Sequence, residues 1–535
     1  DIAMGKRPNA DIAYDEDSIG LFTKLSTIWT FAFCLILWAP RELFFQALWY
    51  LGIKKEHPRG PTKAKGYAPI VTGKDDLFHR GMFYRLKDYF HNQLTGQPGA
   101  WITLRERRPV GAFNFKEQDV EGVWTVKETN NFHHVINLAS YNYMGFANNE
   151  QFCEKNVISS LKHFGVSPCS VSNEMGTTSL HATFEKRVAT YVGQESAIVF
   201  GMGFASNSCT IPAIVHKGDL IISDDKNHAS IAAGCKSSGA KVKPFKHQDF
   251  ADAERIIRNC IRDGQSPNAD EYVPWGKIMI IVEGIYSMEG DILFLPEVIA
   301  LKKKYNCYLY VDEAHSIGGL GEHGRGVCDY YGVDPREVDI LMGTFSKSFG
   351  GAGGYISGKT EIMDYIRQKH WSAIYANHIS VPLATQVLSA MDVITGNDGT
   401  DIGAKKLRQL KANIRFLRKS VEQMGFVSLG CDDSPVVPLM APQLDRLGLL
   451  IKLGRKKHVG IIGVGPPATG VFSGRMRLCV SAGHSKDDIL LVAKFLDECG
   501  ELCQLKFKKK DAEQRYGKKP YLKLYKEYDS TVENN

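Results

Sequence analysis

The residue best placed for covalent chemistry is Lys347, in the run GTFSKSFGG at positions 343–351. The preceding stretch, VDILM at 338–342, has the unbroken apolar character of a buried strand, so Lys347 should lie just past the C-terminal end of a strand. A lysine there can form a Schiff base with an aldehyde cofactor, while neighbouring hydroxyls and bare amides hold a phosphate. The alternative is a solvated loop lysine, which must be weighed against the residues upstream.

The first upstream partner is Asp312, in the run YLYVDEAHS at 308–316. It ends an apolar strand, and a carboxylate in a mostly apolar site can keep a pyridine nitrogen protonated, which turns the ring into an electron sink. His315, three residues later, could hydrogen-bond a ring hydroxyl or satisfy a backbone group. A helix N-cap is the structural alternative for Asp312. Together with Lys347, the electron sink is the better interpretation.

Two further pieces precede these in the chain. The short strand DLIIS at 219–223 leads into DDKNHAS, which would bring His228 to the mouth of the same sheet, where an imidazole can stack on a planar ring or serve as a structural hydrogen-bonder. The run VFGMGFASN at 199–207 predicts a strand, a glycine turn and the start of a helix. Bare amides around Gly203 could cradle a phosphate, with Phe204 as a lid, although such turns are common.

In order and content these runs closely resemble the α-oxoamine synthases, pyridoxal-phosphate enzymes of fold type I that condense an amino acid with an acyl-CoA and release carbon dioxide. The resemblance extends from about Asn137 to Leu502. The runs YNYMG (141–145), EGIYSMEGD (283–291) and PPAT (466–469) are most similar to the serine-using branch. The long extension before the core points to its eukaryotic, lysine-bearing large subunit. Gly470 departs from the pattern, which has a proline there, and this puts the local loop shape in doubt.

The resemblance implies a role for each matching residue. Arg477, in the run RMRLCVSAGH at 475–484, would bind a substrate carboxylate with two parallel hydrogen bonds. Arg475 is the alternative arginine. The structural alternative is that the run is a surface strand with alternating charges and binds no ligand. No metal ligand is implied. The catalytic set would be Lys347, His228 and Asp312; the cofactor-binding set Gly203, Phe204, His228, Asp312, His315, Thr344, Ser346 and Lys347; and the substrate-binding set Asn142 and Arg477.

The implied reaction joins L-serine to palmitoyl-CoA and yields 3-ketosphinganine, CoA and carbon dioxide, the first step of sphingolipid synthesis. Lys347 would remove the serine α-proton, so we expect it in a partly desolvated pocket. The implied partners are a homologous subunit that lacks the lysine and small membrane regulatory subunits. Use of glycine or alanine, transamination, and a non-catalytic membrane scaffold are alternatives, but a scaffold has no need to keep Lys347, Asp312 and His228 together.

The run GLGEHG at 319–324 fits a dinucleotide-binding glycine pattern and follows the strand ending at Asp312. No clear helix with an acidic residue about twenty positions later completes a nucleotide unit. A flexible active-site loop is the better interpretation. The twelve cysteines show no Cys-x-x-Cys pair, which indicates reduced thiols and a catalytic body facing the cytosol.

The 535 residues predict an α/β protein with several domains. Between positions 196 and 357, short apolar strands alternate with helical segments, which is typical of a mainly parallel sheet flanked by helices. The pattern then changes to long helices, such as 404–424, and short strands, so we expect a smaller C-terminal α+β domain. The predicted division is a membrane-associated tail (1–56), a partner-contacting region (57–136), a cofactor-binding large domain (137–381), a small domain (382–505) and a basic tail (506–535).

Two apolar stretches near the N-terminus, 25–39 and 43–53, are interrupted by Pro40-Arg41-Glu42. Each is short of the twenty or so residues that span a bilayer, so a tilted span, an in-plane helix and a soluble packing helix remain open. Membrane attachment, here at the endoplasmic reticulum, would suit an enzyme with lipid-like substrate and product. The net charge of +7 is spread along the chain, the basic tail could touch lipid or a partner or stay solvated, and nucleic acid is an improbable ligand.

Overall fold

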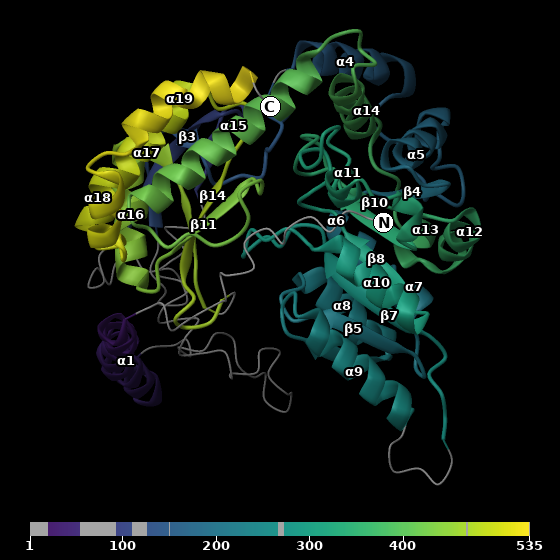
Figure 1. Ribbon diagram of the computed structural model, residues 1–535, viewed down its shortest axis with the longest axis horizontal. Coiled ribbons are helices and arrows are strands. Elements are labelled where there is room, and N and C mark those ends of the chain that lie inside the picture. The colour runs from purple at the N-terminus through teal and green to yellow at the C-terminus, as the bar shows by residue number, and fades with distance from the viewer. Residues whose placement is uncertain are drawn as a thin grey trace.

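The chain forms two lobes, seen on the left and right of Figure 1, and the long helix α15 (Ile402–Gln423) runs along the left one. This computed structural model describes residues 20–53, 92–109, 126–148, 150–265, 272–466 and 469–533. The larger lobe carries the sheet predicted to hold the cofactor. The smaller lobe is built mainly from the C-terminal part of the chain.

The large lobe is organised around a seven-stranded sheet. Its strands pair in parallel except for β10, which is antiparallel to both neighbours. Along the sheet the order is β4 (Ser196–Phe200), β10 (Gly354–Gly358), β9 (Ile340–Thr344), β8 (Tyr308–Asp312), β7 (Ile278–Glu283), β5 (Leu220–Asp224) and β6 (Lys241–Phe245).

Helices cover both faces of this sheet, so its central strands are apolar throughout. On β8, Leu309 and Val311 point into one buried cluster and Tyr310 into the other. The helices of this lobe are α4 (Gln151–Phe164), α5 (Ser179–Val192), α6 (Gly203–Ser208), α7 (Ile211–Ile214), α8 (Ala229–Ser238), α9 (Phe250–Asp263), α10 (Leu295–Tyr305), α11 (Val327–Tyr331), α12 (Thr360–Lys369), α13 (Trp371–Tyr375) and α14 (Val381–Thr395).

The small lobe contains two sheets backed by helices. One sheet has the order β1 (Leu94–Thr95), β2 (Trp101–Pro109), β3 (Val126–Asn137), β12 (Val459–Gly460), and the other β11 (Val436–Met440), β14 (Arg475–Cys479), β13 (Ile462–Val464). The remaining helices are α16 (Leu444–Lys456), α17 (Lys486–Leu502), α18 (Lys509–Tyr516) and α19 (Tyr521–Glu533).

Two predicted segments are used differently from our expectation. Part of the region 57–136, expected to contact a partner, also supplies β1, β2 and β3, and β3 pairs with β12 of the small lobe. The basic tail after 505 folds back as α18 and α19 instead of staying solvated, because its aromatic side chains pack inward: Tyr521 and Tyr528 are each 3% exposed. Residues 57–91 lie outside the described part of the chain.

The two apolar N-terminal stretches form one helix, α1 (Leu21–Tyr50), which continues through Pro40. In Figure 1 it lies beside the small lobe, where the Gln443 amide donates a hydrogen bond to the Ser26 hydroxyl. No helix in the described parts of the chain is long and apolar enough to traverse a bilayer.

The loop with the run GLGEHG is compact. The Gly318 amide donates to the Gly324 carbonyl at 2.7 Å, and the Asp329 carboxylate accepts from the amides of His323 and Arg325 at 2.7 and 3.2 Å. The glycines therefore serve a tight turn, and Gly321 and Gly324 have positive φ angles of 92° and 70°.

Candidate active site

Polar side chains gather where the parallel strands of the large lobe end. Asp224, Glu283, Asp312 and Thr344 close β5, β7, β8 and β9, and Glu283 pairs directly with Asp312 across the sheet. This carboxyl edge is where open α/β sheets bind ligands. Lys347 follows three residues after β9 and so reaches the same edge.

Lys347 is partly buried, and burial lowers the pKa of its amine from 10.5 to about 8, against the opposing effect of the carboxylates of Asp312 and Glu283. Its Nζ lies 5.7 Å from the centre of the Tyr141 ring. No described carboxylate lies within ion-pair distance of it. A substantial fraction of this amine is therefore neutral, and nucleophilic, near physiological pH.

Asp312 is 3% exposed and is held from two sides. Its Oδ1 accepts from the Ala314 amide at 2.8 Å, and its Oδ2 accepts from the Asn207 amide group at 2.7 Å. The Asn207 oxygen in turn accepts from the Tyr310 hydroxyl at 2.7 Å. The carboxylate is thus fixed in orientation while keeping the capacity to accept one further hydrogen bond.

The same asparagine reaches His228. Its amide group also donates to the Ser230 hydroxyl at 2.9 Å, and that hydroxyl lies 2.8 Å from Nδ1 of His228. The His228 backbone N–H donates to the Glu283 carboxylate. His228 still exposes its imidazole, with Phe204 edge-on at 6.3 Å, and partial desolvation lowers its pKa. Asn207 therefore ties together the two residues predicted to grip and to stack on a ring.

His315 lies on the opposite side of the site and is 5% exposed. Its Nδ1 is 2.8 Å from the Tyr143 hydroxyl, and the Tyr141 ring meets it edge-on at 5.1 Å. Burial lowers the pKa of His315 well below its usual value, and the charges of Lys347 and Arg477 act in the same direction. His315 is therefore a neutral imidazole.

The two arginines of β14 differ sharply. Arg475 is committed: it forms a buried ion pair with Glu289 at 3.4 Å and donates to the carbonyls of Ser473 and Met288 at 2.9 Å each. Arg477 has no described carboxylate partner. Its guanidinium lies over the Tyr141 ring at 4.6 Å, its Nη1 donates to the weakly accepting sulfur of Met288 at 3.8 Å, and its Nε is buried without a hydrogen-bond partner. Arg477 is thus the guanidinium available to a ligand carboxylate.

The backbone at the start of α6 lies where the phosphate group is predicted. A Cβ placed on Gly203 would come within 2.9 Å of Cγ2 of Thr344 and 3.3 Å of the Gly353 carbonyl, so this close approach of α6 to the end of β9 requires glycine. Thr344 is buried, while Ser346 is exposed beside Lys347. The backbone amides at the start of α6, the amine of Lys347 and the carboxylate of Asp312 are the groups that pyridoxal phosphate requires.

Asn142 does not present its side chain to this site. Its amide group donates to the Pro98 carbonyl at 3.4 Å and its oxygen accepts from the Ala147 amide at 3.2 Å. Both ends are used within the 98–147 region, which gives Asn142 a structural role. The neighbouring Tyr141 is the side chain that faces Lys347 and Arg477 instead.

Asp224, Asp225 and His247 are close enough to hold a metal ion, with ligand atoms within 4.8 Å of one another. His247 instead bridges carboxylates, with Nδ1 2.9 Å from Asp224 and Nε2 3.3 Å from Asp291. The hydrogen bonds and charges of these carboxylates outweigh the effect of burial and raise the pKa of His247 to about 9. The imidazolium of His247 therefore links two carboxylates of the large lobe by charge-assisted hydrogen bonds.

Sequence reasoning missed several residues of the site, namely Tyr141, Tyr143, Asn207, Glu283 and Tyr310. Each lies in or beside a run that was recognised for another residue. The available signal was the polar side chain at the end of a strand (Glu283) or in the first turn after the glycine loop (Asn207). Nothing in the sequence alone indicates which of them meet across the sheet.

Comparisons with known proteins agree with this geometry. The family model for aminotransferases of class I and II matches residues 133–496. Serine palmitoyltransferase 2 of Dictyostelium discoideum is 46% identical over 445 residues, covering 83% of this chain and 88% of that protein. Long chain base biosynthesis protein 2b of Arabidopsis thaliana is 42% identical, covering 83% and 88%, and serine palmitoyltransferase 3 of Homo sapiens is 39% identical, covering 88% and 82%.

Among solved structures, serine palmitoyltransferase of Sphingomonas wittichii superposes with a TM-score of 0.63 at 26% identity, covering 69% of this chain and 88% of that one. A high-resolution structure of SPT with a PLP internal aldimine gives a TM-score of 0.68 at 24% identity, covering 81% and 98%, and at that identity shows a common fold.

Proposed function

The chain belongs to the serine palmitoyltransferase family of the class I and II aminotransferases, and we propose that it condenses L-serine with palmitoyl-CoA to give 3-ketosphinganine, CoA and carbon dioxide, the first step of sphingolipid synthesis. The observation that carries this proposal is the meeting of three groups between the two lobes. The partly neutral amine of Lys347 and the fixed carboxylate of Asp312 lie at the carboxyl edge of the large sheet. The guanidinium of Arg477, which has no described carboxylate partner, reaches the same Tyr141 ring as Lys347 from β14 of the small lobe.

The cofactor is pyridoxal phosphate, which when bound supplies an electron sink for the negative charge that develops at the serine α-carbon. Lys347 would hold it covalently, Asp312 would accept a hydrogen bond from its ring nitrogen, and His228 would stack on its ring. Gly203, Phe204, Thr344 and Ser346 would surround its phosphate.

The protein's own groups then divide the work. The Arg477 guanidinium binds the serine carboxylate through two parallel hydrogen bonds. The Lys347 amine, once free, takes the α-proton onto Nζ, which its pKa of about 8 suits at neutral pH. The Tyr141 ring lies against both groups and limits the space in which the amino acid can move.

An absorbance titration tests the proposal. Purified protein supplied with pyridoxal phosphate is scanned with L-serine, glycine or L-alanine, and CoA release is then followed with palmitoyl-CoA. We expect a visible band that responds to serine and CoA release that depends on serine, with both lost in Lys347→Ala. A response to glycine or alanine in place of serine would instead identify another synthase of this family. No band in folded, cofactor-supplied protein that also contains its partner would indicate a scaffold.

We further propose a homologous, lysine-lacking subunit as partner, docked beside the start of α6, where the phosphate is predicted. Four large apolar side chains are exposed there: Met175 (88%), Met202 (61%), Trp371 (73%) and Tyr375 (74%). Their segments adjoin, because the Ser172 amide donates to the Ala376 carbonyl and a Cβ on Gly201 would lie 3.7 Å from the Asn377 carbonyl. Such a patch on a monomer marks a protein interface.

Co-purification tests this partner proposal. Tyr375→Glu should release the tagged subunit, whereas Tyr308→Glu, an exposed tyrosine at the opposite end of β8, should not. Retention of the partner by Tyr375→Glu would place the interface elsewhere. We also propose that small membrane regulatory subunits bind this protein. They should co-purify with the tagged subunit in the same experiment.

Attachment to the endoplasmic reticulum membrane, with the catalytic lobes in the cytosol, is proposed through α1. Apolar side chains along this helix are exposed, including Phe22 (80%), Trp29 (69%) and Ile36 (60%). The full chain should float with anionic vesicles, and Trp29→Glu should not. In a second experiment, protease added outside sealed microsomes should digest the catalytic lobes. Flotation that is unchanged in Trp29→Glu would remove α1 from this role.

A further inference from the structure

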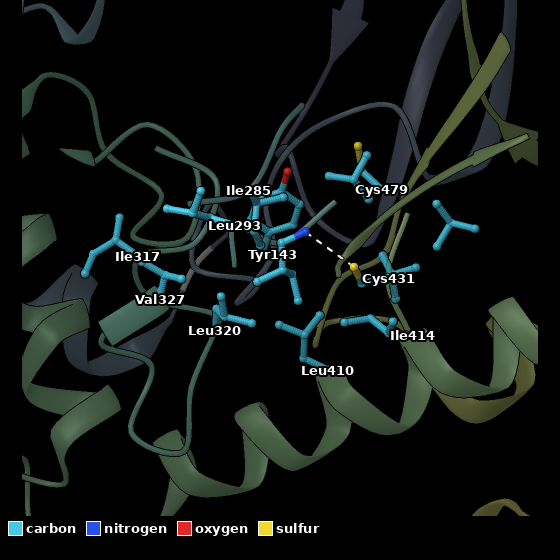
Figure 2. Packing of buried hydrophobic residues seen from close by; sticks show 14 of the residues in the cluster. Tyr143, Ile285, Leu293, Ile317, Leu320, Val327, Leu410, Ile414, Cys431 and Cys479 are labelled. Carbon is cyan, nitrogen blue, oxygen red and sulfur yellow. Dashed lines mark hydrogen bonds between the residues drawn. The ribbon is translucent and has the colours of Figure 1, made fainter. Parts of the chain in front are cut away.

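Tyr143 occupies the seam between the two lobes. Its side chain is fully buried, and Figure 2 shows it between Ile285 and Leu293 of the large lobe and Cys431 and Cys479 of the small lobe. It follows Tyr141, which faces the site, but its own ring points into the protein core. Its hydroxyl is the single polar atom of that side chain, so its one hydrogen bond determines whether a buried polar group is satisfied.

That hydrogen bond goes to His315. The hydroxyl lies 2.8 Å from Nδ1, and the described residues offer it no second partner. If Nδ1 carried the imidazole hydrogen, the phenolic O–H would be buried without an acceptor, which costs free energy. If the O–H donates to Nδ1, both groups are satisfied and the imidazole hydrogen must reside on Nε2.

The two protonation states agree with this direction. Burial raises the pKa of Tyr143 well above its usual value, so the phenol keeps its proton. His315 is neutral for the reason given above, so just one of its ring nitrogens carries a hydrogen. The groups facing His315 are the rings of Tyr141 and Tyr143 and the charges of Lys347, Arg477 and His228.

We infer that Tyr143 is a positioning residue for the reaction: its hydroxyl donates to Nδ1 of His315 and thereby fixes the tautomer in which Nε2–H is presented as a donor to the ring oxygen of the cofactor. This inference rests on the proposed function for the identity of that acceptor. It adds a residue that holds a proton in place without touching the substrate.

The backbone of Tyr143 links this tautomer to the small lobe. Its carbonyl accepts from the Ala482 amide at 2.7 Å, and the Ser481 hydroxyl donates to the Asn142 carbonyl at 2.6 Å. Ser481 follows β14, the strand that carries Arg477. The small lobe, which carries Arg477, therefore also holds the backbone that positions the Tyr143 hydroxyl beside His315.

Tyr143→Phe tests the inference because it removes one oxygen and keeps the ring. The matched control is Tyr191→Phe, which removes an equally buried hydroxyl whose hydrogen bond, 2.8 Å to the Gly324 carbonyl, lies outside the site. The first readout is the ¹⁵N spectrum of full-length apoprotein labelled at histidine, with the His315 signals assigned by their loss in His315→Gln. Protonated and unprotonated ring nitrogens have distinct shifts, so this measurement needs neither cofactor nor activity.

The second readout is the affinity of the apoprotein for pyridoxal phosphate. We expect wild-type His315 to carry its hydrogen on Nε2, and Tyr143→Phe to give a mixture of tautomers with about five- to tenfold weaker cofactor binding, in line with the loss of one buried hydrogen bond. Tyr191→Phe should change neither. An Nδ1–H tautomer in the wild type, or equal weakening in both variants, would overturn the inference. If wild-type protein binds no cofactor the proposed function fails, while the tautomer remains decided by the spectrum.

Discussion

The structure assigns opposite tasks to two arginines that are two residues apart on β14, and a pair of substitutions separates them. Arg477→Lys keeps the positive charge but replaces a planar two-pronged donor with a point charge. Arg475→Met keeps the length of the side chain but removes the partner of buried Glu289. We expect the first variant to lose serine binding and the second to lose stability.

The magnitudes follow from the contacts. A hydrogen bond to a charged group contributes about 1.5–3 kcal/mol, so loss of one of the two from Arg477 should cost about 2 kcal/mol, or roughly thirtyfold in the dissociation constant of serine. Arg475 and Glu289 are 3% and 5% exposed, and breaking such a buried pair costs about 3–5 kcal/mol. The pKa of Glu289 is already raised to about 7 by burial, so protonation of the stranded carboxyl should bring the cost toward the lower figure.

The assay combines two measurements on the same proteins. Serine-dependent change in the visible absorbance gives the dissociation constant directly, and thermal unfolding without serine gives stability. Arg477→Lys should melt within a few degrees of wild type, and Arg475→Met, where it folds, should bind serine nearly as well as wild type. The reasoning is refuted if Arg475→Met weakens serine binding at an unchanged melting temperature while Arg477→Lys binds serine normally.

Four further results are expected. The rate at which the apoprotein captures pyridoxal phosphate should rise with pH, with a midpoint at about 8, as Lys347 loses its proton. Asp312→Asn should lower that midpoint, because the Asp312 carboxylate raises the pKa of Lys347. A midpoint near 10.5 would contradict the desolvation of Lys347. Since the unfolded chain keeps the lysine proton up to about 10.5, Lys347 makes the apoprotein more stable as pH rises from about 8 to 10.5, and Lys347→Met should flatten that part of a urea-denaturation series. Asn207→Ala breaks three buried hydrogen bonds at about 1 kcal/mol each, so it should lower the free energy of unfolding by roughly 3 kcal/mol. It should also weaken cofactor binding at least tenfold. A cofactor affinity equal to that of wild type would show that Asp312 does not need the hydrogen bond from Asn207. Gly203→Ala should weaken cofactor binding and lower the melting temperature, because the added methyl would lie 2.9 Å from Cγ2 of buried Thr344 and displace the start of α6. Unchanged affinity by titration would place the phosphate elsewhere.

Local pattern in the sequence was enough to predict the sheet and its main residues. The strands ending at Asp312 and Thr344 are short apolar runs buried on both faces, and such runs are legible without knowledge of their neighbours. The long helix predicted at 404–424 is α15, within two residues at each end. The N-terminal and tail segments were harder, because burial of α18 and α19 depends on a surface that the sequence does not display.

The candidate site was predicted only in part, for the same physical reason. Lys347, Asp312 and His228 could be named because each follows a strand, and parallel strands bring their carboxyl ends to one edge. Arg477 was preferred to Arg475 on resemblance alone, because the two side chains are chemically alike until Glu289 is seen to pair with Arg475. Side-chain partners across the sheet are non-local and leave no periodic trace in the chain.

The sequence by itself therefore determined the chemistry, which needs an amine, a carboxylate and imidazoles. Each of these groups follows a strand, and parallel strands end at one edge of the sheet. The tertiary structure alone decided how those groups are tuned. It buried Lys347 enough to lower its pKa and let Asn207 donate to both Asp312 and Ser230. It also engaged the Asn142 side chain with Pro98 and Ala147 and put the phenol of Tyr143 against His315. Proton affinity and orientation depend on what surrounds a group in space, and that is set by packing between segments far apart in the chain.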